Sequence, residues 1–232
     1  MKFVFLLIIS FLNQSLHAQQ RLFTTYTDSS ALVSDAEWVI RDFVNRVNDI
    51  SPVISSKPVA ILNTRPYLIF YSPKSNQVNL PIWHQVIEPQ KEFFNQLAGS
   101  EQKGKEVFGL FFNGFYLAHE LGHALKNAIK ISDTSLYANE YSANVIAILY
   151  WKEVQRTEDL KRCYQYAKKF LAQLKNPVPD GEDPVAFFNT HYNELGADPY
   201  KYAYFQFNQF VQIYEGESTG NFRDYIKSYL SQ

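Results

Sequence analysis

Cysteine and methionine are almost absent from this chain of 232 residues, which contains one of each. An internal disulfide needs two cysteines, so the apolar core alone has to stabilise the fold, and the chain is long enough to bury one. Cys163 shares a helical stripe with Leu160 and Ala167. This pattern predicts a buried packing thiol rather than a reactive one.

The chain also lacks an excess of charge of one sign, because it contains 22 basic and 23 acidic residues and no run of basic residues stands out. Nucleic acids and anionic membranes attract proteins through clustered positive charge. We therefore expect neither of them as a partner.

A long uninterrupted hydrophobic run near the N-terminus is missing too, since the apolar run from Phe3 to Leu12 is too short to span a membrane. Lys2 is the only charge before it, and Ala18 offers a small residue at a cleavage position. These features are typical of a secretory signal. We expect residues 1–18 to be a signal peptide and the protein to be secreted or periplasmic, without a membrane anchor.

The N-terminal third combines one helical pattern with short strand patterns. Ser34 and Glu37 have the spacing of a capping box, and apolar residues at helical spacing follow up to residue 50. Short apolar runs separated by turn residues then predict a small, mainly antiparallel sheet. These runs are 59–62, 67–71 and 77–82.

Nearly all signals after Glu88 are helical. One helix is expected over about 105–130 and the next over about 136–153, after several serine, threonine and aspartate N-cap residues. Further helices are expected from Thr157 and from residue 198. The chain therefore predicts an α+β protein that is mostly helical.

The sequence H-E-L-G-H at residues 119–123 lies within an otherwise apolar run from 107 to 125. Histidines at i and i+4 share one face of a helix, so His119 and His123 can reach the same metal ion. Glu120 would then lie close to the water on that metal. This arrangement is typical of a zinc hydrolase.

A catalytic zinc normally takes three protein ligands, so a third one is needed. Metzincins have a third histidine six residues after the second histidine of the motif, but this chain has Ile129 at that position. Its only methionine is Met1, which excludes the Met-turn of that class in the mature protein. Gluzincins use a glutamate on the next helix, where Glu140 stands. Glu194 and Glu153 are the alternatives if Glu140 is not a ligand.

The residues around Glu140 support this choice. Asn144 and Ala147 share its helical face, and the small residues of this segment permit close packing against another helix. Asn144 could orient a ligating histidine through a hydrogen bond.

H-E-L-G-H-A-L followed by E-x-x-A-N-x-x-A resembles the ImmA/IrrE-type metallopeptidases and, more broadly, the thermolysin-like gluzincins. The resemblance covers residues 119–147. It implies that His119, His123 and Glu140 bind Zn²⁺ and that Glu120 is the general base. Thermolysin-like members have an aspartate where this chain has Asn144, as the ImmA/IrrE-type pattern does. Because the chain carries an export signal, the resemblance is taken to imply the chemistry and not a cytoplasmic regulatory role.

The resemblance also implies a zincin-like, two-lobed domain over residues 19–232. We expect an α/β upper lobe with the small antiparallel sheet, then the metal-site helices, then a helical lower lobe. These three parts correspond to residues 19–104, 105–155 and 156–232.

In such a site zinc polarises the scissile carbonyl, and Glu120 moves a proton from water to the leaving amine. The oxyanion needs a second electrophile, for which His191, Tyr192 and Tyr204 are candidates. Tyr192 and His191 are expected next to a loop, whereas core packing is favoured for Tyr204. His84 fits a cleft and a surface position equally.

The expected partner is a peptide or protein substrate, and the sequence indicates no oligomeric state. A non-catalytic binding protein that retains zinc to stabilise a zincin fold is the main alternative. A structural zinc site needs no general base and is usually closed by four protein ligands, so Glu120 weighs against it. A zinc-free interaction protein is the third hypothesis.

Overall fold

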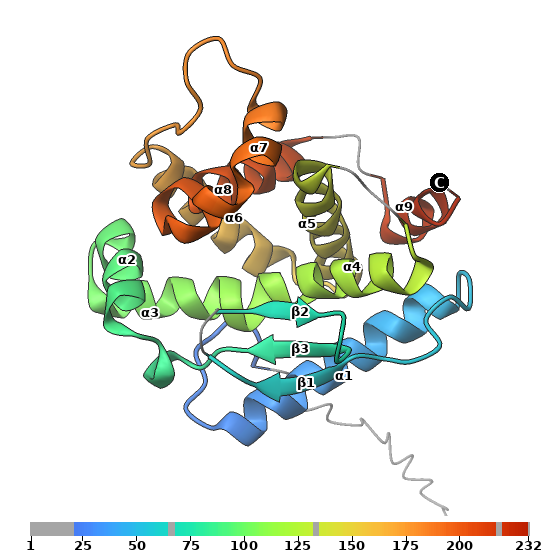
Figure 1. Ribbon diagram of the computed structural model, residues 1–232. Helices are drawn as coiled ribbons and strands as arrows, with labels where there is room; N and C mark the ends of the chain where they lie inside the picture. Colours follow the sequence, from blue (N-terminus) through green and yellow to red (C-terminus); the bar gives the residue numbers. More distant parts are fainter. Residues whose placement is uncertain (1–20, 65–67, 132–134, 217–219, 232) are drawn as a thin grey trace, which may run out of the picture.

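The computed structural model describes residues 21–64, 68–131, 135–216 and 220–231, and it is a mostly helical α+β protein with a small sheet (Figure 1). The expected signal peptide lies outside the described residues, and so does Tyr67, the first residue of an expected strand. Among the described residues, no helix is both long and apolar enough to cross a membrane.

The first helix, α1 (Ser29–Asn48), begins earlier than expected. Asp28 is its N-cap, and Ser34 lies inside the helix, so the predicted capping box was wrong. The Glu37 carboxylate instead accepts a hydrogen bond from the Ala60 backbone N–H at 2.6 Å. Glu37 therefore connects α1 to the sheet and does not cap the helix.

The sheet consists of β1 (Val59–Leu62), β2 (Phe70–Ser72) and β3 (Gln77–Leu80) in the order β1-β3-β2. β2 and β3 form an antiparallel hairpin, but β1 pairs with β3 in parallel. The prediction of a mainly antiparallel sheet was therefore wrong for one of the two pairs, because β1 joins the far side of β3 and makes no hairpin with β2. This order leaves β2 at an edge of the sheet.

Helix α2 (Glu88–Ala98) packs against α3 (Glu101–Leu110), which continues through a π-helical segment, η2 (Phe111–Phe115), into α4 (Tyr116–Ile129). Within η2, Asn113 leaves helical geometry with φ −107° and ψ 16°. π-Helical turns are rare and frequently occur at functional sites. The edge strand β2 contacts α4, so the sheet lies beside the second half of this long helix (Figure 1).

Helix α5 (Leu136–Glu153) has the bounds predicted from sequence, and the Ser135 hydroxyl caps it by accepting from the Ala138 backbone N–H. α5 packs closely against α4. A Cβ atom on Gly122 would lie 3.0 Å from the Ala143 Cα, so the absence of a side chain at Gly122 lets the two helices approach this closely.

Four further helices follow in the described part of the chain and pack around α5: α6 (Thr157–Leu171), α7 (Pro184–Ala197), α8 (Pro199–Glu215) and α9 (Phe222–Tyr229). α8 contacts α5, α6 and α7. Cys163 on α6 is fully buried, which confirms the prediction of a packing thiol. Figure 1 shows these helices on the opposite side of α4 from the sheet.

Candidate metal centre

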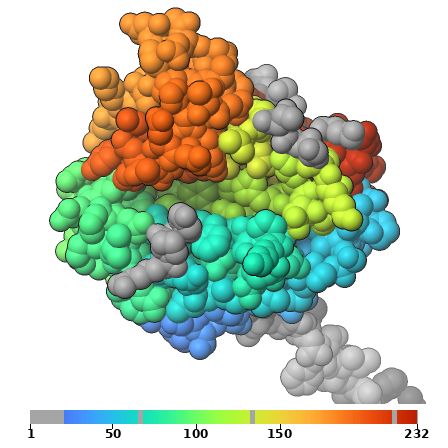
Figure 2. Space-filling view, in the orientation of Figure 1, coloured from blue at the N-terminus to red at the C-terminus, as the bar shows by residue number. Residues whose placement is uncertain are grey.

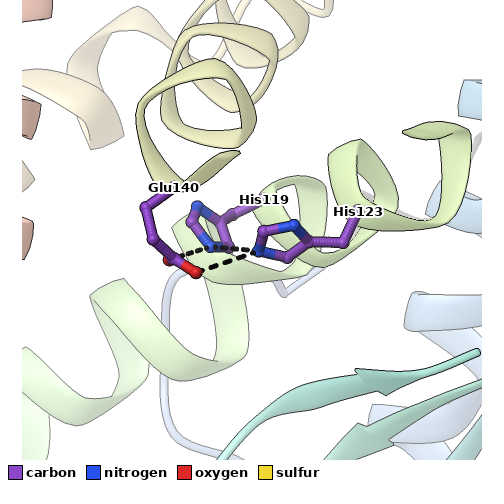
Figure 3. Close-up of side chains that lie close together, drawn as sticks. All are labelled: His119, His123 and Glu140. Carbon is purple, nitrogen blue, oxygen red and sulfur yellow. Dashed lines mark hydrogen bonds and ion pairs between the residues drawn. The ribbon is translucent and has the colours of Figure 1, made fainter. Parts of the chain in front are cut away.

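Two histidines of α4 point to the same place, directly after the π-helical segment (Figure 3). The Nε2 atoms of His119 and His123 are 3.0 Å apart. His119 is buried and His123 is partly buried. Their spacing of one helical turn makes this convergence possible without any distortion of α4.

Glu140 reaches these histidines from α5 (Figure 3). Its Oε2 atom lies 3.3 Å from the His119 Nε2, and its Oε1 atom lies 3.7 Å from the His123 Nε2. The close approach of α4 and α5 at Gly122 makes these distances possible. The three side chains lie close enough together to bind a metal ion.

The electrostatics of the site favour an ionised glutamate. Burial acts to raise the pKa of Glu140, but hydrogen bonding and charge from the two histidines, together with Gln206, lower it to about 2. Burial lowers the pKa of His123. A carboxylate and neutral imidazoles are the protonation states that bind a metal ion.

The Glu120 carboxylate faces the sheet. Its Oε2 atom accepts a hydrogen bond from the Tyr71 backbone N–H of β2 at 2.8 Å. Burial raises the pKa of Glu120 to about 7, opposed by the nearby His123 and by the Tyr71 N–H. A carboxyl group with such a pKa can both accept and release a proton near neutral pH.

Asn144 lies behind His119. Its Oδ1 atom is 2.8 Å from the His119 Nδ1, and its side chain is fully buried. Because the Nδ1 atom faces Asn144, the Nε2 atom of His119 is the one that points to His123 and Glu140.

Two glutamines of α8 also belong to the site, and sequence reasoning missed them. Gln206 donates to the Glu140 Oε2 at 2.8 Å, and the Gln206 and Gln209 Oε1 atoms accept from the Asn144 amide at 3.2 and 3.0 Å. Both glutamines are buried. Their signal in the sequence is the pair of glutamines within the aromatic run Phe205–Phe210, where a buried polar side chain needs a partner.

Of the candidate oxyanion donors, the structure brings Tyr192 to the site. Burial and the nearby Glu140 carboxylate raise the pKa of Tyr192 to about 12, and its ring lies 6.3 Å from that of Tyr202, centroid to centroid. Tyr202 accepts a hydrogen bond from Gln206 at 3.1 Å and was not among the predicted residues. Tyr192 lies within α7, directly after His191, where φ −106° and ψ 17° interrupt the helical geometry.

The other candidates lie elsewhere. His191 is 3.1 Å from Glu194, which is exposed. Tyr204 packs edge to face against Phe205. Two further side chains are exposed, namely Glu153, which pairs with Arg46, and His84, in the short helix η1 (Trp83–Gln85).

Figure 2 shows a groove between the orange surface of α7 and α8 and the teal surface of the sheet. The yellow-green helix that carries the histidines forms its floor. The sheet, with its edge strand β2, lies on one side of this groove, and α7, the helix that contains Tyr192, lies on the other.

Comparisons with known protein families, with curated protein sequences and with solved structures find no match for this chain. The arrangement of the site residues therefore carries the functional interpretation.

Proposed function

We propose that this chain is a zinc metallopeptidase that is exported and hydrolyses peptide bonds in a peptide or protein substrate. The observation that carries the proposal is the convergence of His119, His123 and Glu140 from two packed helices. In a tetrahedral zinc site with bonds of 2.0–2.1 Å, neighbouring ligand atoms are about 3.3 Å apart. The two Nε2 atoms are 3.0 Å apart, and each lies near one oxygen of Glu140, His119 at 3.3 Å from Oε2 and His123 at 3.7 Å from Oε1, so all of these separations are close to that value.

The number of candidate metal ligands also supports a catalytic zinc site over a purely structural one. A structural zinc site usually has four protein ligands, whereas a catalytic site has three and leaves one position open. Among the described residues, the histidine, cysteine and carboxylate side chains that converge on this point are His119, His123 and Glu140. Two histidines with a carboxylate are a ligand set suited to zinc.

A zinc ion bound by these residues would polarise the scissile carbonyl and lower the pKa of water. Glu120 is the general base that takes a proton from the attacking water and delivers it to the amine as the C–N bond breaks. Its hydrogen bond from the Tyr71 N–H holds one carboxylate oxygen, so the other oxygen remains for proton transfer.

Tyr192 is the residue that stabilises the oxyanion of the tetrahedral intermediate. Its hydroxyl lies near Glu140, and its raised pKa keeps the proton on the oxygen at neutral pH. A protonated phenol can donate a hydrogen bond to the negative oxygen that forms in the transition state. His191 is directed instead toward Glu194.

The two-lobed, zincin-like arrangement is part of the same proposal. The groove in Figure 2 separates the sheet-containing part of the chain from the C-terminal helices, which is where such a fold binds its substrate. β2 is an edge strand of the sheet, and an extended peptide can pair with such an edge.

Metal analysis combined with a peptide-library cleavage assay tests the proposal. We expect about one zinc ion per chain, peptide cleavage that stops on chelation, and loss of both properties in His119→Ala/His123→Ala. His84→Ala, which removes an exposed histidine, is the matched control and should behave as the wild type. Zinc retention without cleavage would favour a zinc-stabilised binding protein, and full metal occupancy in the double variant would refute the site.

A further inference from the structure

A chain of buried amide groups connects α8 to the metal centre. Asn144 lies between His119 on one side and the two glutamines of α8, Gln206 and Gln209, on the other. All four side chains are at most 4 % exposed, so bulk water cannot replace these hydrogen bonds.

Two acceptors lie at the ends of this series of amides. One is the Glu140 Oε2 atom, and the other is the Tyr137 backbone carbonyl, which can only accept hydrogen bonds. Gln206 therefore directs its NH₂ group to Glu140, at 2.8 Å, and Gln209 directs its NH₂ group to Tyr137, at 3.3 Å. As a result, both glutamines turn their carbonyl oxygens toward Asn144.

These oxygens determine how the Asn144 amide is oriented. The Asn144 NH₂ group has two hydrogens, and the oxygens of Gln206 and Gln209 accept at 3.2 and 3.0 Å. The Asn144 Oδ1 must then face His119, where it can only accept. In the neutral ring the His119 Nδ1 consequently carries the hydrogen, which leaves the lone pair of Nε2 available to a metal ion.

We propose that Gln206 and Gln209 are positioning residues that select the metal-binding tautomer of His119 through Asn144. This inference rests on the proposed function, because it concerns the same metal centre. A neutral imidazole has two tautomers, and the other one would direct an N–H at the metal. The hydrogen-bond direction set at α8 removes that tautomer before a metal ion binds.

The test compares the wild type with Gln206→Met/Gln209→Met and with Gln212→Met. Methionine is close to glutamine in size and lacks the amide, and Gln212 is an exposed glutamine of the same helix. Nitrogen-15 NMR of metal-free protein, at mildly alkaline pH where imidazole rings are neutral, identifies the tautomer of His119. Competition with a chromophoric chelator measures the affinity for zinc.

We expect the Nδ1–H tautomer in the wild type and in Gln212→Met. In the double variant the Asn144 amide is free to rotate, so a substantial Nε2–H population should appear and zinc affinity should fall by about 10 to 100-fold. Gln209→Met alone keeps the hydrogen bond to Glu140 and should show a smaller change in both measurements. It serves as the second variant if the double variant folds poorly.

An unchanged tautomer and unchanged zinc affinity in Gln206→Met/Gln209→Met would overturn the inference, as would an Nε2–H tautomer in the metal-free wild type. A loss of zinc affinity with the Nδ1–H tautomer retained would also overturn it, because the glutamines would then act only on packing. Because the NMR measurement needs neither metal nor substrate, a wild type with the Nδ1–H tautomer but no peptidase activity would refute the proposed function alone.

Discussion

Replacing Gly122 by alanine tests whether the close approach of α4 and α5 sets the metal centre. His119 and His123 lie on α4 and Glu140 lies on α5, and Gly122 is the point of contact between the two helices. The substitution adds one methyl group at this contact and leaves all three metal-binding side chains in place.

The magnitude follows from the contact distances. The new Cβ would lie 3.0 Å from the Ala143 Cα and 3.3 Å from its Cβ, whereas ordinary contact is 3.4–4 Å. Because a backbone atom cannot rotate away, the helices must separate by several tenths of an ångström. Such overpacking costs about 1–3 kcal/mol, and the better helix propensity of alanine offsets about 1 kcal/mol of this cost.

Metal binding is more sensitive than stability to this separation, because metal–ligand distances tolerate changes of only about 0.2 Å. Zinc has to bring the helices together again against a strain of about 1–2 kcal/mol. We therefore expect zinc affinity to fall by roughly tenfold in Gly122→Ala, with a free energy of unfolding of the metal-free protein lower by about 0–2 kcal/mol.

Chelator competition and chemical denaturation of the metal-free protein measure the two quantities. Gly196→Ala is the matched control, because a Cβ at this helical glycine of α7 would meet no atom within 4 Å. We expect that control to be more stable by about 0.4–1 kcal/mol, with unchanged zinc affinity. If Gly122→Ala behaved in the same way, the two helices would not need this contact to hold the ligands.

Three further predictions concern single carboxylates and an amide. Asn144→Ala should lower zinc affinity by about 10 to 100-fold, and Glu140→Ala should lower it further. If the wild type and Glu140→Ala bound zinc with equal affinity, the third ligand would lie elsewhere. Glu120→Gln should keep its zinc and lower peptide hydrolysis by at least about 10²-fold, and unchanged turnover would reject Glu120 as the base. Burial acts to raise the pKa of Glu37, but the Lys57 ammonium and a backbone N–H lower it overall. The stabilising contribution of the Glu37 carboxylate is therefore present above the ordinary pKa of 4.5 and is lost as the pH falls below that value. Glu37→Gln should therefore lose less stability than the wild type in acid denaturation, and parallel losses would contradict this assignment.

Elements whose signals lie within a few neighbouring residues could be predicted from the sequence. Helix α5 begins and ends where its cap and its apolar pattern predict, because Ser135 acts on the first turn of that helix. β1 also has its predicted bounds, Val59–Leu62. The pair of His119 and His123 is local in the same sense, since residues at i and i+4 share a helix face whatever surrounds them.

Elements that depend on distant partners were predicted wrongly or were missed. Glu37 has the spacing of a capping residue, but its carboxylate interacts with Lys57 and Ala60, about twenty positions further on. The parallel pairing of β1 with β3 depends on which side of the hairpin β1 joins, and no local pattern encodes that choice. Tyr192 lies within α7, which Asp183 caps ahead of Pro184, and the helix is kinked at the neighbouring His191.

The sequence by itself determined the chemistry available at the site, namely two imidazoles one turn apart, a carboxylate between them and a glutamate on the next helix. Only the tertiary structure decided how these groups meet. Glu140 reaches the histidines because Gly122 lets two helices touch, and Gln206 and Gln209 reach Asn144 from α8, more than sixty positions later in the chain. A helical period predicts which side chains share a face, but the packing of one helix on another determines which faces meet.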